Sequence, residues 1–296
     1  MPSDEHVPDD APVLQPHDGR GRRSRITSGL LASELGVLFR RRRTWAMLLA
    51  LAAIPVLIAV AVRLSSSPPT PGHGPPFLDR VTQNGLFVGV TGLVVSIPLF
   101  LPLTIGVVAG DTIAGEAGLG TLRYLLVAPA GRVRLLVVKY IGSAVFAVAA
   151  TLAVVLTGAV IGAVLFPVGP VTLLSGDTIG VGQSIVRAGL VASFVAISLL
   201  GLSAVGLFIS TLTEVPVGAM AATIVLSVTS QVAGSLSQLS WLHPWLFTRY
   251  WLDLGDLLRE PIVWTSFVDN GLLQAGYVAV FGALAYGRFT TKDVLS

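Results

Sequence analysis

The stretch TWAMLLALAAIPVLIAVAV, residues 44–62, decides the fold class of this chain. It holds no charged residue, and as a helix it is long enough to cross a hydrocarbon core of roughly 30 Å. Four arginines, residues 40–43, stand directly before it, which is typical of the cytoplasmic end of a membrane helix. The stretch therefore predicts a transmembrane helix.

Five further apolar stretches follow, so the sequence predicts six transmembrane helices. Their expected ranges are 44–62, 86–108, 140–166, 188–212, 215–236 and 271–286. A helix satisfies its own backbone hydrogen bonds in lipid, as no other open-chain element does. The sequence thus predicts an all-α polytopic membrane protein, in which 53% of the residues are hydrophobic and only 12% are charged, against about 25% in soluble domains.

The distribution of basic residues predicts the orientation. With the N-terminus inside, 14 Lys and Arg residues fall on the cytoplasmic side and five on the outer side. Both termini are therefore expected in the cytoplasm. A cleaved signal peptide ending at residues 59–61 is the alternative, but the 43 residues before the first span are too many for an ordinary leader.

The region before the first span divides into two parts. Residues 1–26 are polar and are expected to be a disordered cytoplasmic tail, whereas residues 27–296 form the transmembrane domain. Within residues 28–40 an apolar stripe with a basic end predicts an amphipathic helix on the membrane surface. The residues assigned to this interface helix are Leu31, Glu34, Leu35 and Leu38.

The longest cytoplasmic connection between spans is residues 109–139. Asp111 stands where a helix N-cap is expected, and Glu116 stands in the early turns, where negative charge suits the helix dipole. Gly115, Gly118 and Gly120 predict a bend before a second short helix. The loop is either a cytoplasmic coupling helix for a soluble partner or a plain connector, and the composition alone favours neither.

The segment 237–267 holds four of the five tryptophans, together with an apolar stripe. It predicts one or two short amphipathic helices at the outer membrane interface, where Trp and Tyr are favoured. The residues assigned to it are Trp241, Trp245, Trp251 and Leu254. The sequence is compatible with two roles for this segment, a simple aromatic belt and a lid over an exit path.

Several kinds of chemistry are missing from the sequence. Neither Lys139 nor Lys292 stands in a phosphate-binding loop, there is no H-E-x-x-H, and cysteine is absent. Ser203 lacks a histidine partner at membrane depth and is expected to be a packing residue, as are Gly158 and Gly162. The spans hold almost no charge, which argues against an ion-coupled carrier. Energy for transport would come from another subunit.

The inner loop nevertheless resembles the coupling region of permease subunits in type-2 ABC exporters. The string that carries the resemblance is Asp111, Glu116, Gly120-Thr121-Leu122-Arg123, Leu125-Leu126, Pro129, Arg132 and Lys139. The amphipathic helix, the six spans and a C-terminal Phe289 with Lys292-Asp293 agree with it. Gly131 departs from the pattern, since the family often has serine before the arginine.

The resemblance implies a permease that is not itself an enzyme. Two such subunits, identical or different, would form an export pathway in the cell membrane, each docked on a separate ATP-binding subunit that holds ATP and magnesium. This chain would bind no cofactor and no nucleic acid. Asp111, Glu116, Gly120, Thr121 and Arg123 would contact the ATPase. The alternatives are a self-contained carrier or channel, a membrane-embedded enzyme and an anchor for a sensor; the substrate stays open.

Overall fold

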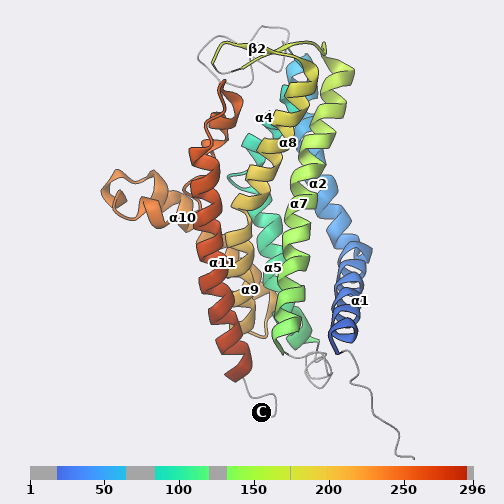
Figure 1. Ribbon diagram of the computed structural model, residues 1–296, viewed down its shortest axis with the longest axis vertical. Helices are drawn as coiled ribbons and strands as arrows, with labels where there is room; N and C mark the ends of the chain where they lie inside the picture. Colours follow the sequence, from blue (N-terminus) through green and yellow to red (C-terminus); the bar gives the residue numbers. More distant parts are fainter. Residues whose placement is uncertain (1–18, 65–83, 120–131, 174, 292–296) are drawn as a thin grey trace, which may run out of the picture.

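The computed structural model describes residues 19–64, 84–119, 132–173 and 175–291. Their elements run in chain order from a first helix to a long last one (Figure 1). The helices are α1 (Gly19–Arg40), α2 (Arg42–Leu64), α4 (Phe87–Ser96), α5 (Phe100–Gly118), α7 (Arg132–Leu165), α8 (Val181–Ser198), α9 (Leu200–Leu212), α10 (Pro216–Ser235) and α11 (Thr265–Thr291). We call the end of the bundle that carries the β-hairpin the hairpin end and the opposite one the C-terminal end.

Six helices in the described part of the chain are long and apolar enough to cross a membrane, which confirms the predicted fold class. Their ranges are Arg42–Leu64, Phe100–Gly118, Val133–Leu165, Val181–Leu212, Pro216–Ser235 and Thr265–Phe289. Two of them extend well past the expected boundaries at the C-terminal end: α5 continues to Gly118, and α7 begins at Arg132. Hydropathy locates the end of an apolar stretch, but a helix continues into polar surroundings when its charges find partners.

Two of the expected spans are broken helices. The second consists of α4 and α5: Pro98 lacks a backbone N–H, which removes a helical hydrogen bond, and the backbone leaves helical geometry at Leu99 with φ -135. The fourth consists of α8 and α9, which meet at Leu199 in a tight turn where its N–H donates to the Ala196 carbonyl at 3.2 Å. Each break exposes backbone groups inside the bundle that other elements must satisfy.

Glycines set the closest helix contact in the bundle. Gly158 and Gly162 of α7 lie directly against the backbone at Gly85 and Gly89, and an added Cβ at any of the four would collide with it. This confirms the packing role expected for Gly158 and Gly162, since small residues four apart let two helices approach. The main core spreads from this contact through Leu93 and residues of α5, α7, α8 and α9.

The predicted loops at the two ends differ from each other. Between α9 and α10 the connection is as short as expected, from Leu212 to Pro216. At the hairpin end, two short antiparallel strands, β1 (Val171–Thr172) and β2 (Thr178–Ile179), lie in the connection between α7 and α8. Gly176 turns between them with φ +94, a conformation that favours glycine.

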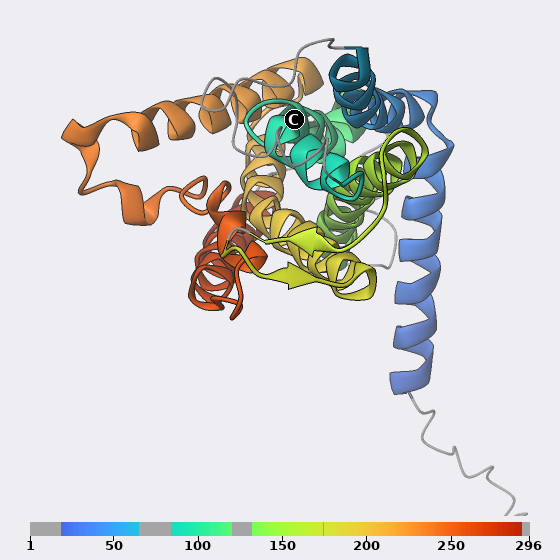
Figure 2. The ribbon, with the colours of Figure 1, turned by 90° about the horizontal axis from the view of Figure 1, so that it is seen from above.

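Two parts project sideways from the bundle. Seen from above, α1 extends across the long axis on one side, and α10 leans outward on another (Figure 2). Residues 236–263, the connecting segment, bring the chain back from α10 to α11; its first part lies at about half the height of the bundle (Figure 1), and its last part reaches the hairpin end, where the Glu260 N–H donates to Ser175 Oγ at 3.1 Å. This segment holds three 3₁₀ helices, Ser237–Leu239, His243–Trp245 and Asp253–Leu258, instead of the predicted amphipathic α-helices. Its frequent turns leave no room for a regular helical face.

The N-terminal region also differs in extent from the expectation. Helix α1 begins at Gly19, so residues 19–26 of the expected tail are helical. Residues 1–18 lie outside the described residues. Leu31, Leu35 and Leu38 are half-buried, as is Glu34, so these four residues share the side of α1 that faces the bundle.

Candidate functional site

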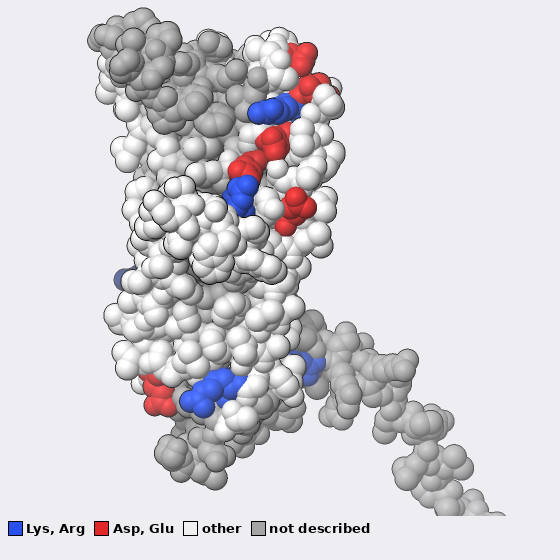
Figure 3. Space-filling view, turned by 90° about the vertical axis from the view of Figure 1, so that its left-hand side faces the viewer, with Lys and Arg blue, Asp and Glu red and all other residues white. Residues whose placement is uncertain are grey.

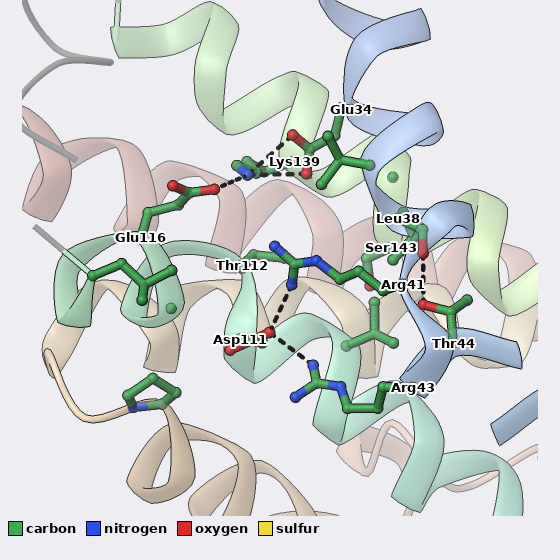
Figure 4. Close-up of a pocket in the computed structure, with 16 residues that line it drawn as sticks. Glu34, Leu38, Arg41, Arg43, Thr44, Asp111, Thr112, Glu116, Lys139 and Ser143 are labelled. Carbon is green, nitrogen blue, oxygen red and sulfur yellow. Dashed lines mark hydrogen bonds and ion pairs between the residues drawn. The ribbon is translucent and has the colours of Figure 1, made fainter. Parts of the chain in front are cut away.

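A cavity of about 230 Å³ lies at the C-terminal end, between α1, α2, α5 and α7 (Figure 4). Charged side chains from all four helices line it, and we call them the charge cluster. Its members are Glu34, Arg41, Arg43, Asp111, Glu116 and Lys139. Three are acidic and three are basic, so the cluster has no net charge of its own.

Asp111 connects α5 to the start of α2. Its Oδ2 atom accepts hydrogen bonds from Arg41 Nη1 at 3.1 Å and from Arg43 Nη2 at 2.7 Å. The carboxylate is 15% exposed, whereas the two arginine side chains are 45% and 44% exposed. The guanidinium groups therefore remain within reach of water or of a partner while they hold Asp111.

Lys139 connects α7 to both α1 and α5. Its Nζ atom lies 2.9 Å from Glu34 Oε1 and 3.0 Å from Glu116 Oε1, and only 5% of its side chain is exposed. A buried ammonium group is stable only when its charge and hydrogen bonds are satisfied, and here two carboxylates do this. The three helices are thus held together through one lysine.

The placement of Asp111 and Glu116 corrects the expected local structure. Neither residue starts a helix: both lie in the last two turns of α5, one continuous helix that begins at Phe100. Negative charge at a helix C-terminus opposes the helix dipole. The basic groups of Arg41, Arg43 and Lys139 offset this, which explains why the helix continues beyond its apolar part.

The rest of the expected coupling site is not described. Gly120, Thr121 and Arg123 lie in residues 120–131, outside the described residues. The structure therefore places two of the five predicted coupling residues. It adds Arg41, Arg43 and Lys139 as their partners, which sequence reasoning treated only as basic residues of the cytoplasmic side or as part of a motif.

The four residues assigned to the outer interface separate into two pairs. Trp241 and Trp245 are 70% and 71% exposed, whereas Trp251 and Leu254 are almost completely buried. Trp251 donates its indole Nε1–H to the Ser198 carbonyl at 3.0 Å. This bond satisfies one backbone group at the break between α8 and α9, so Trp251 belongs to the bundle core.

Gln274 and Arg187 also hold the connecting segment to the bundle, and Asn270 accepts a hydrogen bond from Gln274; together with Trp251 we call these residues the clamp. Gln274 of α11 accepts a hydrogen bond from Gly201 N at 3.2 Å and donates one to the Phe247 carbonyl at 2.8 Å. Next to it, Asn270 donates to Ser198 Oγ at 2.8 Å. Gln274 is 1% exposed and Asn270 is fully buried.

Arg187 of α8 completes the clamp nearer the hairpin end. It donates from Nη1 to the carbonyls of Leu257 at 2.8 Å and of Arg259 at 2.7 Å, and it forms an ion pair with Glu260. Its side chain is 8% exposed. The expected spans leave Arg187 in the connection just before the fourth span, and no local pattern marks it as a residue that binds the backbone 70 positions away.

Charged groups on the side of the molecule with the connecting segment fall in two places. One group lies in the upper half and one at the C-terminal end, with a mostly uncharged band between them (Figure 3). In the described part of the chain, no group of His, Asp and Glu residues has the arrangement of a metal site. The charged and polar residues described above provide structural contacts at two levels of the bundle.

Six membrane-length helices with buried polar contacts define an α-helical multi-pass membrane protein. Residues 30–230 match the family described as ABC-2 family transporter protein, so the chain belongs to this family and is a membrane permease component of ABC transport. The match covers the charge cluster and ends within α10, before the connecting segment. No curated protein matches the chain.

Proposed function

We propose that this chain is the membrane-spanning permease subunit of an ATP-driven exporter. Two permease subunits form the translocation pathway, and a separate ATP-binding subunit docks on the C-terminal end of each. ATP and magnesium bind to that subunit, and this chain contributes the mechanical path. The C-terminal end faces the cytoplasm of a cell membrane, as the 14-to-5 distribution of basic residues favours.

One observation carries this proposal: ion pairs join the end of α5 directly to α2 and α7 and, through Lys139, to α1. A partner that contacts this end or the adjacent residues 120–131 displaces α5, α1 and α7 together. The ion pairs of Asp111 with its two arginines, whose side chains are 45% and 44% exposed, exchange partners at little cost in free energy, while the buried Lys139 keeps α1, α5 and α7 associated. The charge cluster is therefore suited to transmit a movement while its helices stay associated.

The experiment is co-purification from native membranes with an affinity-tagged chain. We expect an ATP-hydrolysing protein to co-purify with the chain in a stoichiometric amount. We expect the Glu116→Ala variant to release this protein or to abolish the effect of ATP on the permease. Glu260→Ala, at the other half of the molecule, is the control and should retain the ATPase. Absence of any ATP-hydrolysing partner from the wild-type preparation, in mild detergent and in native nanodiscs, would contradict the proposal.

The orientation has its own test. The chain contains no cysteine, so single cysteines at Leu119 and Thr178 report on the two ends without background. Both positions are exposed. An impermeant thiol reagent applied to intact cells should label Thr178→Cys and spare Leu119→Cys until the cells are opened. The reverse labelling pattern would show that the C-terminal end of the bundle faces away from the cytoplasm, where it could not contact an ATP-binding subunit.

A further inference from the structure

Ser210 of α9 reaches into the backbone of α5. Its hydroxyl donates to the Gly110 carbonyl at 2.8 Å and accepts the backbone N–H groups of Ile113 at 2.9 Å and of Ala114 at 2.8 Å. In an undisturbed α-helix, the Ala114 N–H points to the Gly110 carbonyl. A side chain inserted between them opens one turn of the helix, which is a recognised cause of helix bending.

The packing around this turn explains how the hydroxyl reaches it. Gly206, one turn before Ser210, lies against Ala109, and Gly110 lies against the backbone at Met220 of α10. An added Cβ at either glycine would come within 2.7 Å of these neighbours. The small residues thus bring α9 and α10 close enough for Ser210 to contact the α5 backbone directly.

The opened turn leaves its polar groups satisfied. Thr112 Oγ1 donates to the Ala109 carbonyl at 2.7 Å, and Ser210 Oγ occupies the other side of the opening. Other buried hydroxyls in this protein behave differently: Ser203, also on α9, donates to the Leu199 carbonyl of its own helix at 3.0 Å. Ser203 and Ser210 are both 0% exposed, so burial does not distinguish them.

The position of the opened turn gives it a functional meaning. It divides α5 into a longer part before Gly110 and a short end after Ala114 that carries Glu116 of the charge cluster, while Asp111 lies within the turn itself. A helix with one ladder position replaced by a hydroxyl bends there more readily than a helix with an unbroken ladder. Movement of the end of α5 is then concentrated at this turn.

We propose that Ser210 is a positioning residue that makes residues 110–114 the pivot of α5, so that the end bearing Glu116 turns relative to the rest when the ATPase moves it. The inference rests on the proposed function for the origin of that movement. The geometry of the pivot itself does not depend on it, and the two parts are tested separately.

The first test needs no ATPase. Val37 of α1 and Leu119 at the end of α5 both line the cavity and are exposed, so a Val37→Cys, Leu119→Cys pair reports their separation through its rate of cross-linking by a short bis-maleimide. Ser210→Ala lets the Ala114 N–H bond the Gly110 carbonyl directly and moves the end of α5. In the Ser210→Ala variant, the cross-linking rate of the cysteine pair should change by more than it does in the Ser203→Ala variant. In the Ser210→Thr variant, the rate should return to that of the cysteine pair alone. Equal rates in Ser210→Ala and Ser203→Ala would overturn the inference.

The second test uses the complex with the ATPase that co-purifies with the chain. Adding ATP and magnesium should change the cross-linking rate of the cysteine pair, and Ser210→Ala should reduce this response about tenfold, the range expected for a lost coupling free energy. A full response in Ser210→Ala would overturn the inference. If the unmodified pair does not respond to ATP although the ATPase is bound, the proposed function fails, while the first test still decides the role of Ser210.

Discussion

The charge cluster at the C-terminal end and the clamp nearer the hairpin end use polar side chains in opposite ways. In the charge cluster, side chains bind side chains, and the two arginines are nearly half exposed. In the clamp, Arg187, Trp251 and Gln274 bind backbone carbonyls and are buried. Both regions join segments that are distant in the chain, but only the first is able to exchange its partners.

This difference indicates which end of the protein is built to move. A backbone carbonyl in a buried turn has no other donor within reach, so a lost clamp contact leaves an unsatisfied group that costs about 1–3 kcal/mol. An exposed ion pair contributes about 1 kcal/mol or less, because water replaces either partner. The connecting segment is therefore a fixed part of the bundle from residue 246 onward, whereas the α5 end is held loosely enough to respond to a partner.

The strongest test of the comparison is Arg187→Met. It removes two hydrogen bonds from a charged donor, one to the buried Leu257 carbonyl and one to the partly buried Arg259 carbonyl, and we expect the unfolding free energy to fall by about 3 kcal/mol. The measurement is thermal unfolding in detergent, with proteolysis of residues 246–260 as a local readout. Arg249→Met is the matched control, since Arg249 is 46% exposed and pairs with Asp253 at 3.3 Å. An equal loss of unfolding free energy in both variants would mean that the clamp contacts stabilise the fold no more than a surface ion pair does.

Gln274→Leu tests the clamp without changing charge. The leucine leaves the N–H of Gly201 and the carbonyl of Phe247 without partners, so the unfolding free energy should fall by about 2 kcal/mol. Gln231, which is half-buried and donates to the Pro98 carbonyl at 2.8 Å, gives the control variant Gln231→Leu. We expect a smaller effect there. A Gln274→Leu protein as stable as the wild type would mean that water satisfies these groups.

Lys139→Met tests the centre of the charge cluster. It leaves Glu34 and Glu116 facing each other, but both carboxylates are 20–25% exposed and reach water, so we expect a loss of only about 1–2 kcal/mol. The larger effect should be on the response to ATP. The charge reversal Glu116→Lys with Lys139→Glu should recover part of that response, and each single reversal should not. Failure of the double variant to exceed both singles would show that this pair carries no coupling.

Asp111→Asn should have a smaller effect on stability. Its arginine partners remain solvated, so the expected cost is below about 1 kcal/mol at low salt and smaller at high salt. The measurement is the unfolding midpoint at two ionic strengths. A loss as large as that of Arg187→Met would mean that the charge cluster is as rigid as the clamp.

The smallest expected effect belongs to Asp253 in the connecting segment. Burial raises the pKa of its carboxyl group, the nearby Arg249 lowers it, and Asp256 raises it again. Because the folded-state pKa lies above the ordinary value, folding favours the protonated form, and ionisation destabilises the fold as pH rises through the raised pKa. Asp253→Asn should therefore gain stability relative to the wild type at neutral pH and lose this advantage as pH falls. An advantage that grows toward acid pH would contradict the direction of the shift.

The sequence predicted the number of spans and their approximate places because apolar stretches of membrane length have few other structures open to them. It also predicted the packing role of Gly158 and Gly162. It misplaced the ends of α5 and α7, because neither hydropathy nor a cap pattern reveals that Lys139 pairs with Glu34 and Glu116, or that Asp111 pairs with two arginines before α2. The local sequence around Asp111 does not distinguish a position at the start of a helix from a position near its end.

The connecting segment was the least predictable part. Its tryptophans indicate an interface by composition, yet Trp241 is exposed and Trp251 is buried ten residues later. What separates them is the break between α8 and α9, whose free carbonyl at Ser198 accepts the Trp251 indole. No local pattern contains that information, since the two partners are 53 positions apart.

The sequence by itself determined that this protein lies in a membrane, how many times it crosses and which family motif it carries, because these depend on the residues within one helix or loop. Only the tertiary structure decided that Ser210 opens a turn of α5, that Lys139 joins three helices and that Arg187 fixes the connecting segment. Each of these contacts satisfies a polar group that its own helix cannot satisfy. The hydrogen-bond partner of such a group comes from a segment that is distant in the chain and close only in the folded protein, so the local sequence does not identify it.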